Sequence, residues 1–183
     1  MSTVPDALAV LRFWFDEIAP AAWWRVDPDF DRTLGDRFGA LHEAARQGEL
    51  WAWRDSAEGR LAEVIVLDQF SRNLHRGTPA AFAQDPMALA LAQEAVARGC
   101  LQALAELPRT FLLMPYMHSE SRLVHTTAEP LFRQHTPADN QAFELRHKAI
   151  VDRFGRYPHR NAILGRPSTA EELDFLAGPG SSF

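Results

Sequence analysis

Apolar residues recur at three- and four-residue spacings along nearly the whole chain, which is the pattern of helices with one buried face. No window shows sustained alternation of apolar and polar residues rich in β-branched side chains, so we expect essentially no β-sheet. The pattern predicts an all-α fold of about seven to nine helices, stacked as antiparallel helical hairpins.

Local start signals place several of these helices. Thr3 with Asp6 resembles a capping box, so the first helix is predicted from about Val4 to Ile18. Asp27-Pro28 and Asp85-Pro86 each set a capping acid before a proline at the first helical position, where the missing N–H costs nothing. Both pairs therefore predict helix N-termini, with the acid in a capping role.

Further helices follow from the same signals. Asp55 with Glu58 predicts the start of a helix through "RLAEVIVLDQF", whose apolar residues surround the helix axis and indicate that it is largely buried. The run "RTFLLMPYMHSE" predicts a helix that is kinked or interrupted near Pro115, and another helix is predicted from Ala138 to Phe154. We expect a single helical domain over residues 1–177 and a disordered tail over residues 178–183.

The first polar cluster lies at the end of the predicted buried helix. Asp68 continues the inward-facing stripe, and Arg72 follows four residues later, within reach of an ion pair. Together with Gln69 and Asn73, this pair can present guanidinium donors to an anion in a cavity. The alternative is structural: a buried salt bridge, with Asn73 capping the end of the helix.

The second polar cluster is the stretch "RYPHRNAILG". Pro158 stiffens it, so that His159, Arg160 and Asn161 are held in place at little further entropic cost. Rigid polar loops often bind ligands, which makes these three residues candidate ligand-binding groups. The alternative is a clamp that ties the loop to neighbouring helix ends.

The third candidate group contains two histidines and an acid. His147 lies on an apolar face of its predicted helix, where a neutral imidazole needs a hydrogen-bond partner. If His118, Glu120 and His147 converge, a carboxylate-oriented histidine can act as a general base. The competing interpretation is that each is a satisfied core or loop residue.

Composition narrows the classes of partner. The net charge of -5 argues against binding to nucleic acid, and no apolar run approaches the length of a membrane-spanning helix. The N-terminus does not resemble a signal peptide, and the one cysteine, Cys100, fits a reducing compartment, so we expect a cytoplasmic protein. Phosphate-loop, dinucleotide and paired-cysteine motifs are absent, as is a complete di-iron motif, so neither a cofactor nor a metal is expected.

Several of these stretches together resemble one known family. "VLDQFSRNLHRGTPAAFAQDPMALALA", "FLLMPYMHSE" and "HKAIVDRFGRYPHRNAILGRPST" are similar, in this order, to a bacterial family known as domain of unknown function nine-two-four. The resemblance implies a tetratricopeptide-like helical fold, although the tetratricopeptide consensus itself is not visible, and it implies no activity. Ser71 and His75 depart from the family pattern, which usually has proline and an aromatic residue at these positions.

Three functional interpretations follow from these residues. The first is a binding module with a polar cleft in which Asp68, Arg72, Asn73, His159, Arg160 and Asn161 hold a small anionic or polar ligand, or a peptide. The second is a hydrolase-like enzyme in which His118 or His147 is the base, Glu120 orients it, and the arginines stabilise negative charge. The third is a protein-interaction scaffold with an apolar groove. The sequence identifies neither the ligand nor the oligomeric state.

Overall fold

A computed structural model describes residues 6–181, and in this part of the chain every regular element is a helix or a helical turn, as expected. The helices are α1 (Ala7–Arg12), α2 (Pro28–Arg46), α3 (Ala57–Ile65), α4 (Ser71–Leu74), α5 (Asp85–Ala97), α6 (Cys100–Ala103), α7 (Glu106–Met117), α8 (Arg122–His135), α9 (Ala138–Phe154) and α10 (Ala170–Leu176). Two π-helical turns, Phe13–Glu17 and Val66–Phe70, extend α1 and join α3 to α4. Single 3₁₀ turns cover Pro20–Trp24, Trp51–Asp55, Pro79–Phe82 and Pro158–Arg160.

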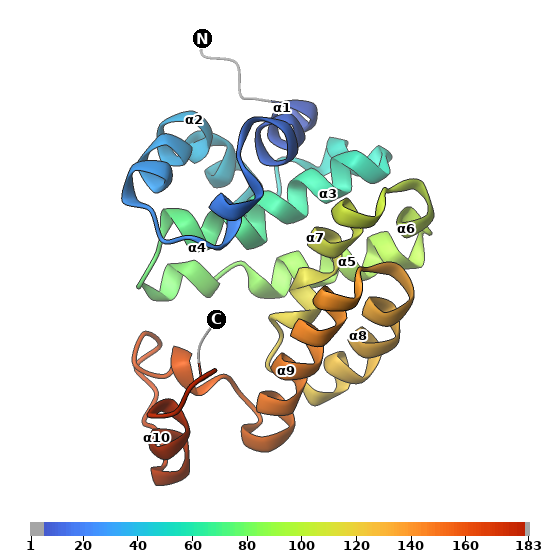
Figure 1. Cartoon of the computed structure of the whole chain (residues 1–183). Helices are drawn as coiled ribbons and strands as arrows, with labels where there is room; N and C mark the ends of the chain where they lie inside the picture. Colours follow the sequence, from blue (N-terminus) through green and yellow to red (C-terminus); the bar gives the residue numbers. More distant parts are fainter. Residues whose placement is uncertain (1–5, 182–183) are drawn as a thin grey trace.

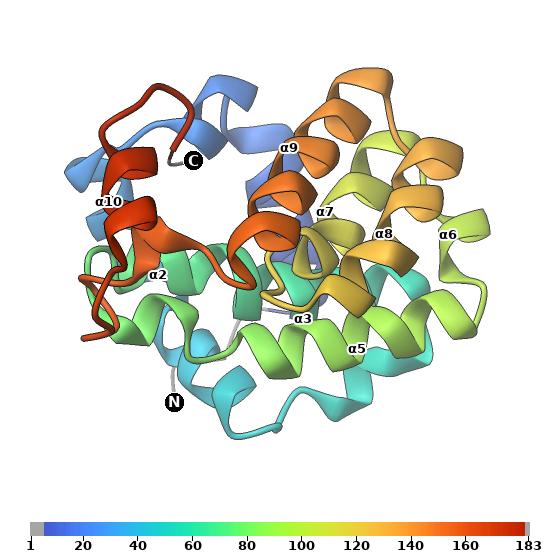
Figure 2. The same cartoon turned by 90° about the horizontal axis from the view of Figure 1, so that it is seen from below.

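The helices pack mainly against their neighbours in the chain. Helix α3 is central, because α1, α5 and α7 all pack against it, while α7, α8 and α9 form a consecutive stack beside it (Figure 1). Seen from below, α5 runs along α3, and α10 lies beyond the end of α9 (Figure 2). Every residue from Gly59 to Ser71 is buried, which confirms the buried helix expected from its apolar composition.

The start of the chain differs from the expectation. Thr3, assigned to the first capping box, lies outside the described residues, and Asp6 caps α1 by accepting a hydrogen bond from the N–H of Ala9. Similarly, Ser56 rather than Asp55 caps α3, because its hydroxyl accepts from the N–H of Gly59. The cap predicted at Asp27 for α2 is confirmed, and Thr169 caps α10 in a capping box with Glu172.

The C-terminal segment packs on a small core of its own. Ile150, Val151 and Tyr157 are buried there, with Phe154 and Phe175 against them, separately from the main core around α3. Polar contacts also join this segment to the rest, from Arg160 to Asp85 of α5 and from Arg166 to Glu120 after α7. Within the described residues, no helix is both long and apolar enough to cross a membrane.

Candidate functional site

The first residue of the candidate site lies in a π-helical turn that continues the buried helix α3. Residues Val66–Phe70 form this turn between α3 and α4, and the side chain of Asp68 within it is only 1% exposed. A π turn inserts an extra residue into the helical repeat, which changes the direction of the side chains that it carries, and such turns are frequent at functional sites. Here it places a carboxylate, rather than another apolar group, against the end of α7.

Three side chains donate hydrogen bonds or charge to Asp68. Its carboxylate contacts Nδ1 of His118 at 2.8 Å, Nε2 of Gln69 at 2.6 Å and Nη1 of Arg72 at 3.1 Å. Burial alone raises the pKa of Asp68, but the charge of Arg72 and the hydrogen bonds from His118 and Gln69 outweigh it and hold the pKa below its usual value. Asp68 is therefore ionised, and the ion pair with Arg72 expected from the sequence is present.

His118 ends α7 with a defined tautomer. Because an ionised carboxylate only accepts hydrogen bonds, the Nδ1 atom that contacts Asp68 carries the proton. Burial, and then the charge of Arg72, lower the pKa of His118, so the ring is neutral near pH 7. The basic nitrogen, Nε2, is thus the one left for a molecule in the neighbouring cleft, which His118 lines.

Asp85 does not cap α5, contrary to the expectation. It is the first residue of the helix, after Gln84, and its carboxylate accepts two hydrogen bonds from Arg72, at 3.0 and 3.1 Å. A third contact, at 3.3 Å, comes from Nη1 of Arg160. Two guanidinium groups from distant segments attract the carboxylate more strongly than the local N–H groups of a helix end, which explains the correction.

Arg160 is the most unusual charged group of the site. Its side chain is 8% exposed, and its Cζ lies 4.6 Å from the ring centres of both Phe82 and Tyr157. The long contact to Asp85 is its one ion pair, and among the described residues its buried Nε has no hydrogen-bond partner. Burial, and then the neighbouring charge of Arg72, lower the pKa of Arg160, so its positive charge is poorly compensated.

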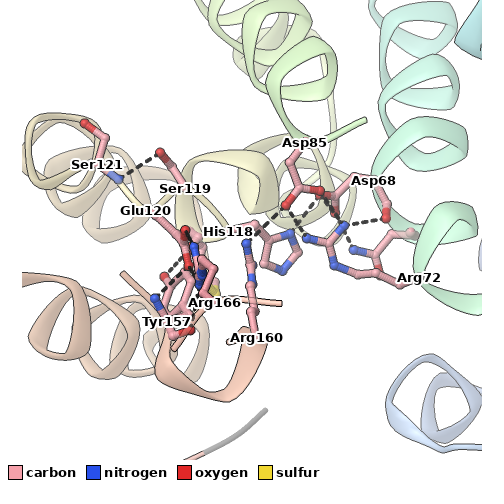
Figure 3. A network of polar contacts seen from close by, with 12 residues as sticks. Asp68, Arg72, Asp85, His118, Ser119, Glu120, Ser121, Tyr157, Arg160 and Arg166 are labelled. Atoms are coloured by element: carbon pink, nitrogen blue, oxygen red, sulfur yellow. Dashed lines mark hydrogen bonds and ion pairs between the residues drawn. The ribbon is translucent and has the colours of Figure 1, made fainter. Parts of the chain in front are cut away.

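Asp85, His118 and Arg160 line a cleft of about 360 Å³ between α5, the end of α7 and the segment that follows α9. Figure 3 shows Asp68, Arg72, Asp85, His118 and Arg160 gathered into one network. The polar part of the lining is Asp85, His118, Ser119, Glu120 and Arg160, and the apolar part is Pro79, Phe82, Ala83, Pro86, Leu89, Pro115 and Leu164.

Glu120 fixes the loop after α7 instead of orienting a histidine. Its carboxylate accepts hydrogen bonds from Arg166 at 2.6 and 2.9 Å and from the N–H of Tyr157 at 2.7 Å (Figure 3). Burial raises the pKa of Glu120, but these hydrogen bonds outweigh it and lower the pKa overall. Asp68, and not Glu120, is the carboxylate that contacts His118.

The other two candidate histidines lie beside the cleft but do not line it. Nδ1 of His147 contacts the backbone carbonyl of Phe143 at 2.8 Å, and its ring centre is 6.5 Å from that of His118. Burial is the main cause that lowers the pKa of His147 to about 3 and that of His159 to about 4. Both rings are therefore neutral packing groups around Tyr157.

The two asparagines point away from the arginines with which they pair in the sequence. Asn73 donates to Asp31 at 2.8 Å, a carboxylate that also binds Arg76. Asn161 is buried and donates to Ser168 at 3.0 Å. The arginines of the two Arg-Asn pairs thus converge on one carboxylate, whereas their amides hold separate parts of the chain together.

Sequence reasoning missed three members of the site. The sequence pattern predicts a local capping role for Asp85 and gives no functional signal for Phe82 or Arg166. No local signal distinguishes them, because an acid before a proline resembles a cap and an aromatic residue among alanines resembles core. Their roles depend on contacts with residues 46 to 78 positions away, a separation that helical periodicity does not encode.

Two other kinds of site are less well supported. Within residues 6–181, no three His, Cys, Asp or Glu side chains lie close enough together to hold a metal ion. The large exposed apolar side chains lie on different elements, among them Trp24, Trp51, Leu123 and Phe143.

Comparisons with known proteins agree with the sequence resemblance. The model of a family described as bacterial protein of unknown function, DUF924, matches residues 10–180. The structure is similar to that of ATU0120, a protein of unknown function from Agrobacterium tumefaciens, with 39% identity and a TM-score of 0.88 over 93% of this chain and 96% of the other. No curated protein matches the chain.

Proposed function

We infer that this chain, which belongs to the DUF924 family of bacterial proteins of unknown function, binds a small monoanion with an apolar body in the cleft beside Arg160. The observation that carries this proposal is the buried guanidinium of Arg160, whose Nε has no partner among the described residues. A buried, poorly compensated charge is costly, and an anion in the cleft relieves that cost.

The surrounding charges favour a single negative charge. The arginines Arg72, Arg160 and Arg166 face the carboxylates Asp68, Asp85 and Glu120, so that the network is close to neutral without a ligand. A monoanion in the cleft pairs with the guanidinium of Arg160, which has one long ion pair among the described residues. A dianion such as phosphate places a second charge near three carboxylates, where repulsion disfavours it.

The apolar lining supports the rest of the ligand. Phe82, Pro86, Leu89 and Leu164 offer a hydrocarbon surface next to the charged end of the cleft. A volume of about 360 Å³ lies at the small end of the range for small-molecule pockets, which favours a small molecule over a peptide. A short monocarboxylic acid has both the single negative charge and the small apolar group that this proposal requires.

The test measures the binding of acetate, butyrate and benzoate, with inorganic phosphate for comparison, by titration calorimetry and thermal unfolding. At ten times its Kd, a bound acid stabilises the native state by about 1.4 kcal/mol. For a chain of this size, that stabilisation raises Tm by about 3 to 6 °C. We expect saturable binding of at least butyrate or benzoate, and weaker binding of phosphate.

Two variants locate the binding. Arg160→Gln removes the guanidinium and is expected to abolish binding of the acid. Arg25→Gln makes the same chemical change at a side chain that is 67% exposed and paired with Asp27, and it should bind like the parent protein. Equal affinity of Arg160→Gln and the parent protein, or no saturable binding of any of the three acids, would refute the proposal.

A further inference from the structure

The Asp68–His118 pair has the arrangement of a general base. A buried, ionised carboxylate contacts Nδ1 of the ring at 2.8 Å and fixes the tautomer in which Nε2 carries the lone pair. A histidine held this way accepts a proton at Nε2, and the carboxylate stabilises the imidazolium that forms. Asp68 is itself held by Gln69 and Arg72, so the ring has little freedom to turn away.

We propose that the cleft hydrolyses carboxylic esters with short apolar acyl groups, with His118 as the general base that activates a water molecule. The inference rests on the proposed function, because the product of such a reaction is the monocarboxylate that Arg160 is proposed to bind. A tetrahedral oxyanion carries the same single charge as that carboxylate, so the guanidinium of Arg160, which lines the cleft, stabilises both.

The steps balance without a further reactant. Water attacks the carbonyl carbon of the ester, its proton moves to Nε2 of His118, and the carbonyl oxygen becomes an oxyanion next to Arg160. The bond between the carbonyl carbon and the alcohol oxygen then breaks. The proton on Nε2 passes to the departing alkoxide, which leaves as the alcohol. The carboxylic acid that forms gives its remaining proton to solvent water, and its carboxylate stays next to Arg160.

Water is a better nucleophile here than a serine of the chain. Ser119 lines the cleft, but its hydroxyl accepts a hydrogen bond from the N–H of Ser121 at 3.2 Å, and no contact of it with His118 is found among the described residues. The other Ser-His pair, Ser71 with His42, is buried, and its hydroxyl donates to the carbonyl of Leu67 at 2.6 Å. That proton is not available for a reaction with a substrate.

The experiment measures hydrolysis of 4-nitrophenyl butyrate by the full chain, with buffer alone as the background. His118→Gln keeps a donor for Asp68 but has no basic nitrogen, so we expect kcat to fall about 100-fold or more while the Kd for butyrate stays unchanged. The control is His135→Gln, at the end of α8 and outside the cleft lining, which should retain full activity.

The pH profile adds a readout that a merely structural role would not produce. Six groups from five elements face or neighbour the ring of His118, namely Asp68, Arg72, Asp85, His147, His159 and Arg160. Because the pKa of His118 lies below its ordinary value, kcat/KM should rise with one ionisation below about pH 6.5 and then level off. This ionisation should be missing from the residual rate of His118→Gln.

The outcomes separate the two proposals. If butyrate binds in an Arg160-dependent way but the ester is not cleaved above background, or His118→Gln and His135→Gln retain equal activity, hydrolysis is refuted and binding stands. If no monocarboxylate binds, the proposed function itself fails, and any hydrolysis observed does not take place at the site proposed here. Thermal unfolding of His118→Gln confirms that a lost rate does not reflect a lost fold.

Discussion

Replacing Arg160 with methionine tests whether this arginine serves a ligand or the architecture. Methionine keeps most of the side-chain length and can pack on the same two rings, Phe82 and Tyr157. The variant loses one long contact to Asp85, worth about 1 kcal/mol, and two buried cation–π contacts of about 2 kcal/mol each, of which the sulfur–aromatic contacts of methionine recover about 0.3 to 1.5 kcal/mol each. It also removes a buried donor without a partner, which costs the native state about 1 to 3 kcal/mol.

These contributions nearly cancel, because Asp85 keeps its two hydrogen bonds from Arg72 and no buried carboxylate loses its only partner. We therefore expect Arg160→Met to change the free energy of unfolding by no more than about 1 kcal/mol in the absence of a ligand. Arg72→Met is the matched comparison. It removes the guanidinium from both Asp68 and Asp85, and we expect it to cost about 3 to 5 kcal/mol.

The assay is urea-induced unfolding at pH 7, followed by tryptophan fluorescence and by circular dichroism. Both variants must show a single cooperative transition with a similar slope for the comparison to be valid. A loss of about 3 kcal/mol or more in Arg160→Met, comparable with that in Arg72→Met, would show that Arg160 is a structural clamp. The proposed anion site would then lose its physical basis.

Three further predictions concern pH and backbone geometry. Burial lowers the pKa of His42 to about 4, so the unfolded chain takes up this proton first as the pH falls. The free energy of unfolding should therefore decrease between pH 6.5 and about 4, and it should decrease less in His42→Asn, as measured by urea unfolding at a series of pH values. A hydrogen bond from Arg156 is the main cause that lowers the pKa of Glu172 from 4.5 to about 2, so the contribution of Glu172 to the free energy of unfolding is present above pH 4.5 and lost as the pH falls toward 2. Glu172→Gln should be less stable than the parent protein at pH 7 and should lack this part of the acid dependence in the same titration. Gly59→Ala would drive its Cβ into the backbone oxygen of Trp53 and should lower Tm strongly. Gly39→Ala, in the middle of α2 with nothing within 4 Å of the added Cβ, should stabilise the protein by about 0.5 to 1 kcal/mol, and equal thermal stability of the two variants would contradict this reasoning.

The sequence predicted the helices well because helix formation depends on local signals. The period of the apolar residues, the cap at Asp27 and the capping box of Thr169 with Glu172 all act within four or five residues. Errors arose where two local signals competed. At the start of α3, for example, Ser56 is the N-cap, although the pattern predicts its neighbour Asp55 in that position.

The inward position of Asp68 was also readable, because it continues an apolar stripe and has an arginine four residues later. The π-helical turn that carries Asp68 could not be predicted from the sequence. Its longer hydrogen-bond repeat uses the same kinds of residues as an α-helix, so no local sequence pattern indicates it. The same holds for the first predicted helix, which ends in another π turn, Phe13–Glu17.

By itself, the sequence determined which segments are helical, which helix is buried, and that a carboxylate and two arginines are available near its polar stretches. Only the tertiary structure decided which of them meet. Asp68 contacts His118 over 50 positions, and Asp85 contacts Arg160 over 75. The physical reason is that periodicity records which face of a helix avoids water, whereas the partner of a buried charge depends on how the helices stack.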